Sequence, residues 1–186
     1  MPQDGLILYM PFNGTADVKV GTLVSSQGNI TFGEEAGQKY GIFDGSTAFS
    51  LKTDLGDETI EPCTLVCYAK GTFSSSQTAT GQVCALQAYS QGGASDWGLG
   101  VYINSSNGFT GYSNISCIRN AWNFFCLRRT SRTSYKIQIN SNVYTDNWGS
   151  SNLGTGNFIG YDGSNKYYWV GNIFDVALYN RLLTDD

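Results

Sequence analysis

The chain contains no histidine among its 186 residues. This absence excludes the usual serine and cysteine hydrolases, whose catalytic triads use an imidazole base, and it excludes histidine as a metal ligand. The sequence is also poor in charge, because only 14% of its residues are Asp, Glu, Lys or Arg and the formal net charge is −4. We therefore expect neither nucleic acid nor an anionic membrane as a partner, since both reward dense Lys and Arg.

Long apolar runs are also missing, so no segment of the sequence predicts a transmembrane helix. The first predicted strand begins at Leu6, which leaves no room for a signal peptide. The only basic cluster contains Arg128, Arg129 and Arg132. We interpret it as a solvated strand end, with a docking patch as the alternative.

The five cysteines are an odd number and none forms a CxxC pair, which speaks against a zinc site and a complete disulfide framework. Cys63 and Cys67 share the parity of Leu65, and Cys126 follows an aromatic run. These spacings predict small core residues in strands, with free buried thiols. One bridge among the five cysteines is the alternative.

What the sequence does contain is glycine, 23 in all, and aromatic residues at 14%. This composition favours a turn-rich, all-β protein, and the length is that of one domain, residues 1–186. Alternating patterns and Asn-Gly or Asp-Gly turns predict the strands. They fall within residues 6–14, 40–51, 64–70, 81–89, 97–103, 108–112, 115–118, 122–129, 135–142, 156–160 and 169–186.

The last of these segments is apolar at both parities, which predicts a strand covered on both faces. Regular alternation would place Ile173, Asp175 and Ala177 on one face. Asp175 is then a carboxylate in an apolar strand, and it needs a hydrogen bond, a cation or a metal. We expect it to be either a structural anchor or a ligand.

This segment resembles the final strand of laminin G-like domains in the concanavalin A-like lectin and glucanase superfamily. The resemblance is carried by Gly171, Ile173, Asp175, Val176, Leu178, Tyr179, Asn180, Arg181 and Leu183, with Phe174 as a one-residue insertion. Further matches occur at Phe12-Asn13-Gly14, Phe43-Asp44-Gly45, Thr64–Lys70 and Trp122–Arg129. The resemblance implies a two-sheet antiparallel β-sandwich, the concanavalin A-like jelly roll.

It further implies a non-catalytic recognition module for glycans or cell-surface polysaccharide. With the missing leader and the unpaired thiols, it suggests an adhesin or fibre domain of a phage or virus particle, with other virion or cell-surface proteins as partners and a homo-oligomer as a possible state. One alternative is a structural decoration domain that binds only protein. A fold does not fix a function, so both hypotheses stay open.

A divergent glycoside hydrolase is the second alternative, because glycosidases on this fold use paired carboxylates. The Glu-x-Asp-x-x-Glu pattern of that type is absent. The four glutamates are Glu34, Glu35, Glu58 and Glu61, and the last two lie in a predicted polar connection. We therefore predict no enzymatic activity.

Sugars are bound by aromatic rings together with polar side chains that hydrogen-bond to hydroxyl groups. Loop residues of both types are the predicted ligand-binding set: Trp148, Asp146, Asn147, Asp162, Asn165 and Tyr167. We expect Trp169, Tyr9, Tyr68 and Trp122 to pack instead.

Calcium is a common structural ion in the superfamily that the chain resembles, and it prefers oxygen ligands. Asn13, Asp17, Asp44 and Asp175 are the candidate ligands, because the terminal strands of this fold tend to pair. The alternative is turn capping by Asn13 and Asp44 and hydrogen bonding by Asp175.

Overall fold

The computed structural model describes residues 2–53, 62–72, 81–87, 100–103, 108–109, 115–116, 118, 120–131, 134–147, 156–161 and 168–184. All regular secondary structure in this part of the chain is β-strand. The strands are β1 Leu6–Met10, β2 Thr22–Gln27, β3 Thr31–Glu35, β4 Gln38–Asp44, β5 Ala48–Lys52, β6 Cys63–Gly71, β7 Gly81–Gln87, β8 Gly100–Ile103, β9 Gly108–Phe109, β10 Ile115–Ser116, β11 Asn123–Ser131, β12 Ser134–Ile139, β13 Asn142–Asn147, β14 Gly156–Ile159 and β15 Val170–Tyr179. No described segment is a helix that could cross a membrane.

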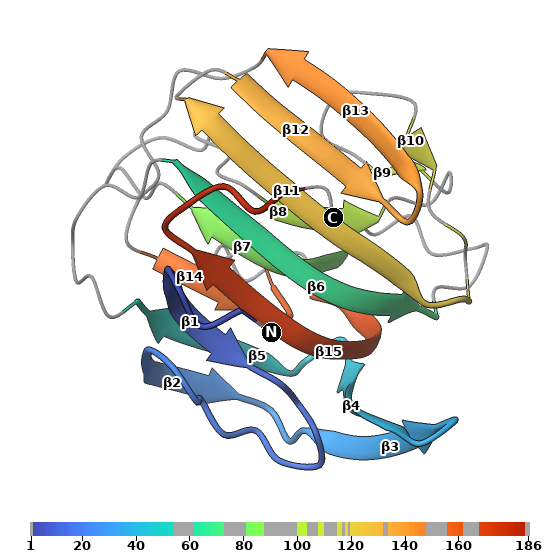
Figure 1. Ribbon diagram of the computed structural model, residues 1–186. Helices are drawn as coiled ribbons and strands as arrows, with labels where there is room; N and C mark the ends of the chain where they lie inside the picture. The colour runs from blue at the N-terminus through green and yellow to red at the C-terminus, as the bar shows by residue number, and fades with distance from the viewer. Residues whose placement is uncertain are drawn as a thin grey trace, which may run out of the picture.

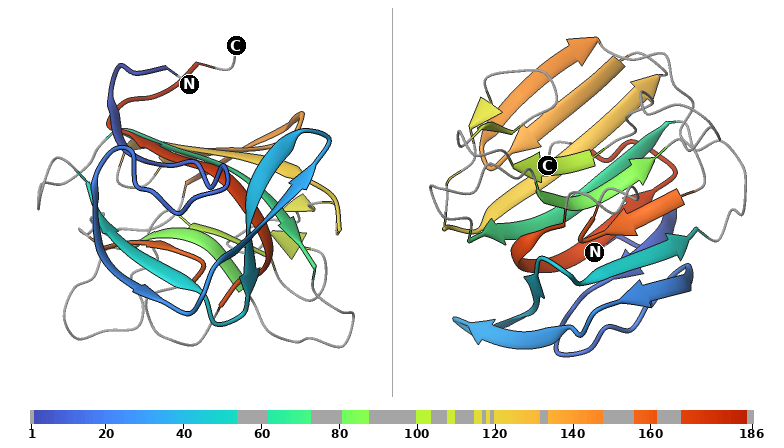
Figure 2. Two further views of the ribbon diagram at one scale, coloured as in Figure 1. Left: turned by 90° about the horizontal axis from the view of Figure 1, so that it is seen from below. Right: turned by 180° about the vertical axis from the view of Figure 1, so that it is seen from behind.

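The strands form two antiparallel sheets that face each other (Figures 1 and 2). The first sheet has the order β13-β12-β11-β6-β15-β4-β3, with β1 also paired to β15. The second has the order β10-β9-β8-β7-β14-β5-β2. The predicted all-β, two-sheet sandwich is therefore confirmed. The two ends of the chain lie together on the outer side of the first sheet (Figure 2, left).

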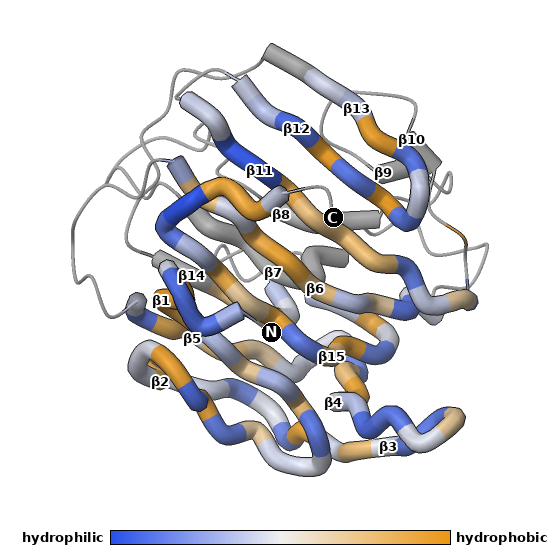
Figure 3. Tube along the Cα trace, in the orientation of Figure 1, coloured by the Kyte–Doolittle hydropathy of each residue, from blue (hydrophilic) through white to orange (hydrophobic). Residues whose placement is uncertain are grey.

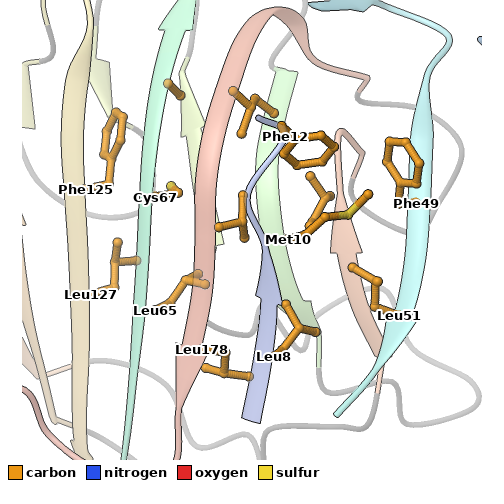
Figure 4. Close-up of a cluster of buried hydrophobic side chains, with 14 of the residues drawn as sticks. Leu8, Met10, Phe12, Phe49, Leu51, Leu65, Cys67, Phe125, Leu127 and Leu178 are labelled. Carbon is orange, nitrogen blue, oxygen red and sulfur yellow. The ribbon is translucent and has the colours of Figure 1, made fainter. Parts of the chain in front are cut away.

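The space between the sheets is filled by apolar side chains from both (Figure 4). Phe12, Phe43 and Phe49 form an aromatic cluster with ring centroids 5.4–6.1 Å apart. Trp169 is fully buried, as predicted. Cys63 and Cys67 belong to this core, whereas Cys126 lies on the other face of the first sheet, and none of the three forms a disulfide.

Strand β15 lies within the first sheet and pairs with three strands, β6, β4 and β1. Its first half lies between β6 and β4, and its second half lies between β6 and β1. Its pairing with β6 shifts by one residue between Phe174 and Ala177, which is a β-bulge at the point where the neighbour changes.

Because of the bulge, the regular alternation of side chains that the sequence predicts for β15 is wrong after Phe174. Ile173, Val176 and Leu178 belong to the core between the sheets, whereas Ala177 belongs to a second apolar cluster on the outer face. The extra residue therefore reverses the parity of the strand after Phe174, and a strict two-residue period assigns Ile173 and Ala177 wrongly to one face.

The other predicted strands are found wherever the structure describes them, but β2, β3 and β13 were not predicted. All six residues of β2 are exposed, so its sequence carries no buried face. Hydrophobic and hydrophilic residues alternate along β12, where the prediction was correct (Figure 3). The Asp-Gly turn after β4 is a corner between the two sheets, since β4 and β5 lie in different ones.

Candidate binding groove

A groove of about 480 Å³ lies on the outer face of the first sheet. Its floor is formed by outward-facing residues of β6, β11 and β15, and its walls by residues near the two ends of the chain. The lining residues are Pro2, Val66, Tyr68, Phe124, Cys126, Arg128, Gln138, Asp175, Tyr179, Arg181, Leu183 and Thr184. This volume lies in the range of roughly 300–1,000 Å³ that is typical of small-molecule sites.

Aromatic rings cross the strands beside the groove in one row. Phe174 on β15 is paired with Tyr68 on β6, which is paired with Phe124 on β11. The rings of Tyr68 and Phe174 are stacked, with centroids 4.6 Å apart and planes 3° apart, and Tyr68 lies 5.0 Å from Phe124. All three side chains are half-buried. The contacts between the rings hold them in place, so Tyr68 and Phe124 form a preformed aromatic wall of the groove.

Two further rings extend the row away from the groove. Trp122 packs edge-on against Phe174 at 4.9 Å and against Tyr40 at 5.2 Å. Its indole N–H donates to Glu35 Oε2 at 3.0 Å, and Lys70 Nζ donates to the same oxygen at 2.9 Å. The hydrogen bonds from Lys70 and then Trp122 hold the pKa of Glu35 below its usual value. Trp122 thus packs as predicted, although on the outer face, whereas Tyr68 packs and also lines the groove.

Asp175 is the residue at the bulge and lines the groove. Its φ is +52°, in the left-handed region that few non-glycine residues adopt. Its backbone N–H donates to the carbonyl of Pro11 at 3.1 Å, and the Tyr9 hydroxyl donates to Oδ1 at 2.8 Å. Backbone strain of this kind is frequent at functional sites.

The negative charge of this carboxylate affects the pKa values of three nearby tyrosines. Burial, and then the hydrogen bond to Asp175, raise the pKa of Tyr9 above its usual range. Burial followed by the Asp175 charge raises the pKa of Tyr68. Burial also raises the pKa of Tyr179, with Arg181 opposing and Asp175 adding to the rise. The three hydroxyl groups therefore stay protonated at neutral pH and can donate hydrogen bonds.

The C-terminal wall of the groove is fixed by two buried side chains. Arg128 donates from Nε to the Leu183 carbonyl at 2.8 Å and from Nη2 to the Thr184 carbonyl at 2.9 Å. The Thr64 hydroxyl donates to the Arg181 carbonyl at 2.8 Å and accepts from the Leu183 N–H at 3.0 Å.

The interpretation of the arginine cluster as a solvated strand end is wrong for its two described members. Arg128 is 5% exposed and Arg129 is fully buried. Arg128 anchors the C-terminal segment, and the Arg129 guanidinium lies 5.4 Å from the centre of the Tyr135 ring.

The predicted ligand-binding loops are separate from this groove or outside the described residues. Trp148, Asp162, Asn165 and Tyr167 are not among the residues that the structure describes. The backbones of Asp146 and Asn147 belong to β13, where they pair with Tyr135 and Ser134 of β12. The prediction for these six residues stays untested. The groove itself was missed, although the shared parity of Trp122, Phe124, Cys126 and Arg128 was a signal for it.

The four candidate calcium ligands do not share hydrogen-bond partners in the described part of the chain. Asp17 accepts from Thr15 and Lys19, and Asn13 is exposed. Asp44 Oδ1 accepts from the backbone N–H and hydroxyl groups of both Ser46 and Thr47, which is the capping of a turn. No three His, Cys, Asp or Glu side chains form a metal-binding group within the described part of the chain. Calcium binding stays a prediction.

No protein-family model matches the sequence, and no curated protein matches it. Solved structures do match the fold. Domain 4 of AbnA, a GH43 extracellular arabinanase from Geobacillus stearothermophilus, solved with arabinotriose, has a TM-score of 0.63 at 14% identity and covers 98% of this chain and 96% of that chain.

Two other similar structures belong to longer chains. The receptor-binding domain of the botulinum neurotoxin C/D mosaic serotype has a TM-score of 0.66 at 11% identity, with 97% of this chain and 49% of that chain covered. Trypanosoma rangeli sialidase has a TM-score of 0.67 at 14% identity, with 98% and 32% covered. The chain thus spans about half of the toxin domain and a third of the sialidase. At these identities the similarity shows a shared β-sandwich fold.

Proposed function

We propose that this chain is a non-catalytic recognition module that binds carbohydrate in the groove of the first sheet. The observation that carries this proposal is the chemistry of the groove lining. Two rigid aromatic rings, Tyr68 and Phe124, lie in one groove with the carboxylate of Asp175 and the amide of Gln138. Aromatic rings pack against the C–H surfaces of a sugar, and fixed polar groups bind its hydroxyls.

The comparisons support this proposal at the level of the fold. One similar domain was solved with arabinotriose, and another is a receptor-binding domain. We further propose membership of the concanavalin A-like superfamily, in its laminin G-like branch, from the motifs of β15. An extracellular or virion-surface setting, such as an adhesin or fibre domain, is part of the same proposal. Cys63, Cys67 and Cys126 form no disulfide, which fits a chain that is made in the cytosol and used outside.

The lining of the groove also supports binding without catalysis. Most glycoside hydrolases use two carboxyl groups roughly 5–9.5 Å apart on either side of the scissile bond. Asp175 is the only carboxylate among the lining residues that the structure describes. The described lining therefore lacks the second carboxyl group of that common mechanism, which favours binding over hydrolysis.

The test is a glycan array with the protein at high valency, run with calcium and again with chelator. We expect saturable binding that Tyr68→Ala and Phe124→Ala abolish. Loss with Trp148→Ala or Tyr167→Ala instead would move the site to the predicted loops, and loss with chelator alone would establish the metal. Absence of binding to every glycan under all conditions would contradict the proposal and favour the structural assembly domain. Hydrolysis of a bound glycan would favour the glycosidase.

A further inference from the structure

We infer that Asp175 sets the specificity of the groove, because its carboxylate oxygen Oδ2 accepts a hydrogen bond from one hydroxyl group of a neutral sugar. The inference rests on the proposed carbohydrate binding, and it adds the contacting residue and the chemistry of the ligand.

The first argument is the use of the two carboxylate oxygens. Tyr9 donates to Oδ1 and thereby fixes the orientation of the side chain. Within the described residues, Oδ2 receives no hydrogen bond, although the side chain lines the groove. A carboxylate has about four lone-pair sites, so Asp175 keeps accepting capacity for a ligand in a fixed position.

The second argument is the backbone at the bulge. A left-handed φ is adopted most easily by glycine and next by asparagine or aspartate. Neither the bulge nor the N–H bond to Pro11 requires a negative charge at position 175, since glycine would satisfy both. The carboxylate therefore adds a function that the fold of β15 does not need. Holding the Tyr9 hydroxyl is the structural alternative, and the experiment below separates the two.

The third argument concerns the charge of the ligand. Two cations line the groove, but the guanidinium of Arg128 is bonded to two carbonyls of the C-terminal segment. The Nε of Arg181 donates to the Asp4 carbonyl at 2.8 Å and lies 3.2 Å from the Asp4 carboxylate. The charge of Arg181 is paired with that of Asp4. The charge of Arg128 is matched in number by that of Asp175, so the groove has no excess positive charge to attract an acidic sugar. We therefore expect a neutral, hydroxyl-rich sugar.

The experiment uses the neutral glycan that binds most tightly on the array, together with its set of monodeoxy analogues. Affinities are measured by calorimetry for the unmodified protein, Asp175→Asn, Asp175→Gly and Asp17→Asn. Both replacements at position 175 suit the left-handed backbone, so the strand should keep its fold. Asp17 is an exposed carboxylate outside the groove, and its variant is the matched control.

For the unmodified protein and Asp17→Asn, we expect one deoxy analogue to bind about 10–100-fold more weakly than its parent. For Asp175→Gly, the parent should bind as weakly as that analogue does to the unmodified protein, and removing the hydroxyl should have no further effect. Asp175→Asn should lie between the two.

Three results would overturn the inference. If Asp175→Gly kept the parent's affinity and the same deoxy profile, Asp175 would serve only as the partner of Tyr9, while loss of binding in Tyr68→Ala would still support the groove. Preferential binding of an acidic glycan would overturn the assignment of a neutral ligand. Absence of binding to every glycan by the unmodified protein would overturn the proposed function and this inference together.

Discussion

The hydroxyl of Thr64 should stabilise the C-terminal wall of the groove, and Thr64→Val is the sharpest test of this. The side chain is fully buried, and valine keeps its shape while removing the oxygen. The substitution deletes the donor to the Arg181 carbonyl and the acceptor of the Leu183 N–H. Each of these backbone groups then loses its partner at the point where the chain leaves β15.

The magnitude follows from the two lost hydrogen bonds. A hydrogen bond contributes a net of about 0.5–1.5 kcal/mol, so their sum is about 1–3 kcal/mol. The segment can lower the cost by moving into water, whereas the bonds from Arg128 to Leu183 and Thr184 oppose that movement. We therefore expect the free energy of unfolding to fall by about 2 kcal/mol.

Urea unfolding gives this free energy, and hydrogen exchange at the Leu183 amide reports release of the segment. Thr130→Val is the matched control, because its hydroxyl also donates to a carbonyl, that of Ser134, but is exposed. The control should change stability by less than about 0.5 kcal/mol. The reasoning is refuted if Thr64→Val costs no more than Thr130→Val, or if exchange at Leu183 is unchanged.

Three further predictions concern stability. Gly37 has a φ of +84° and open space around it, so Gly37→Ala should lower the free energy of unfolding in urea by about 1–2 kcal/mol. Gly171→Ala should lower it by more than about 3 kcal/mol or prevent folding, because the added Cβ would meet the Lys70 backbone; equal costs for the two variants would contradict this. The pKa of Asp44 is lowered by hydrogen bonds from Ser46 and then Thr47, so the stability that this carboxylate contributes is present above the ordinary carboxyl pKa of about 3.9 and is lost as pH falls below it. Asp44→Asn should therefore flatten the acid side of a stability–pH curve, and an unchanged slope would count against this. The raised pKa of Tyr68 makes its contribution present below about pH 10 and lost as pH rises further, so Tyr68→Phe should reduce alkaline destabilisation measured by urea midpoints.

The fold was predictable because its core strands carry strong local patterns. Cys63, Leu65 and Cys67 alternate inward on β6, and Phe125 and Leu127 do so on β11. The strand β2 was missed because both of its faces are exposed, so its pairing with β5 depends on backbone hydrogen bonds that no side-chain pattern reports.

Local pattern gives the shared parity of Phe124, Cys126 and Arg128 but not the whole groove, because its lining comes from strands that are far apart in the sequence. Phe124 and Tyr68 meet through the pairing of β11 with β6, and Tyr68 meets Phe174 through the pairing of β6 with β15. A single sequence gives the parity of each strand but not which strand lies beside it. Trp122 was therefore assigned correctly to packing, but neither the outer face that it covers nor the place of Tyr68 in the groove was foreseen.

The position of Asp175 links the fold to the proposed chemistry. Strand β15 exchanges β4 for β1 as its neighbour, and the chain needs an extra residue there to keep pairing with β6 on its other side. That extra residue lets Phe174 and Ala177 both face outward, and it puts Asp175 between them with its backbone held by Pro11. The irregularity that interrupts the sequence pattern thus also creates the polar centre of the groove. A sheet without the bulge would continue its alternation and present an apolar face at this point, with aromatic rings but no fixed acceptor for a sugar hydroxyl.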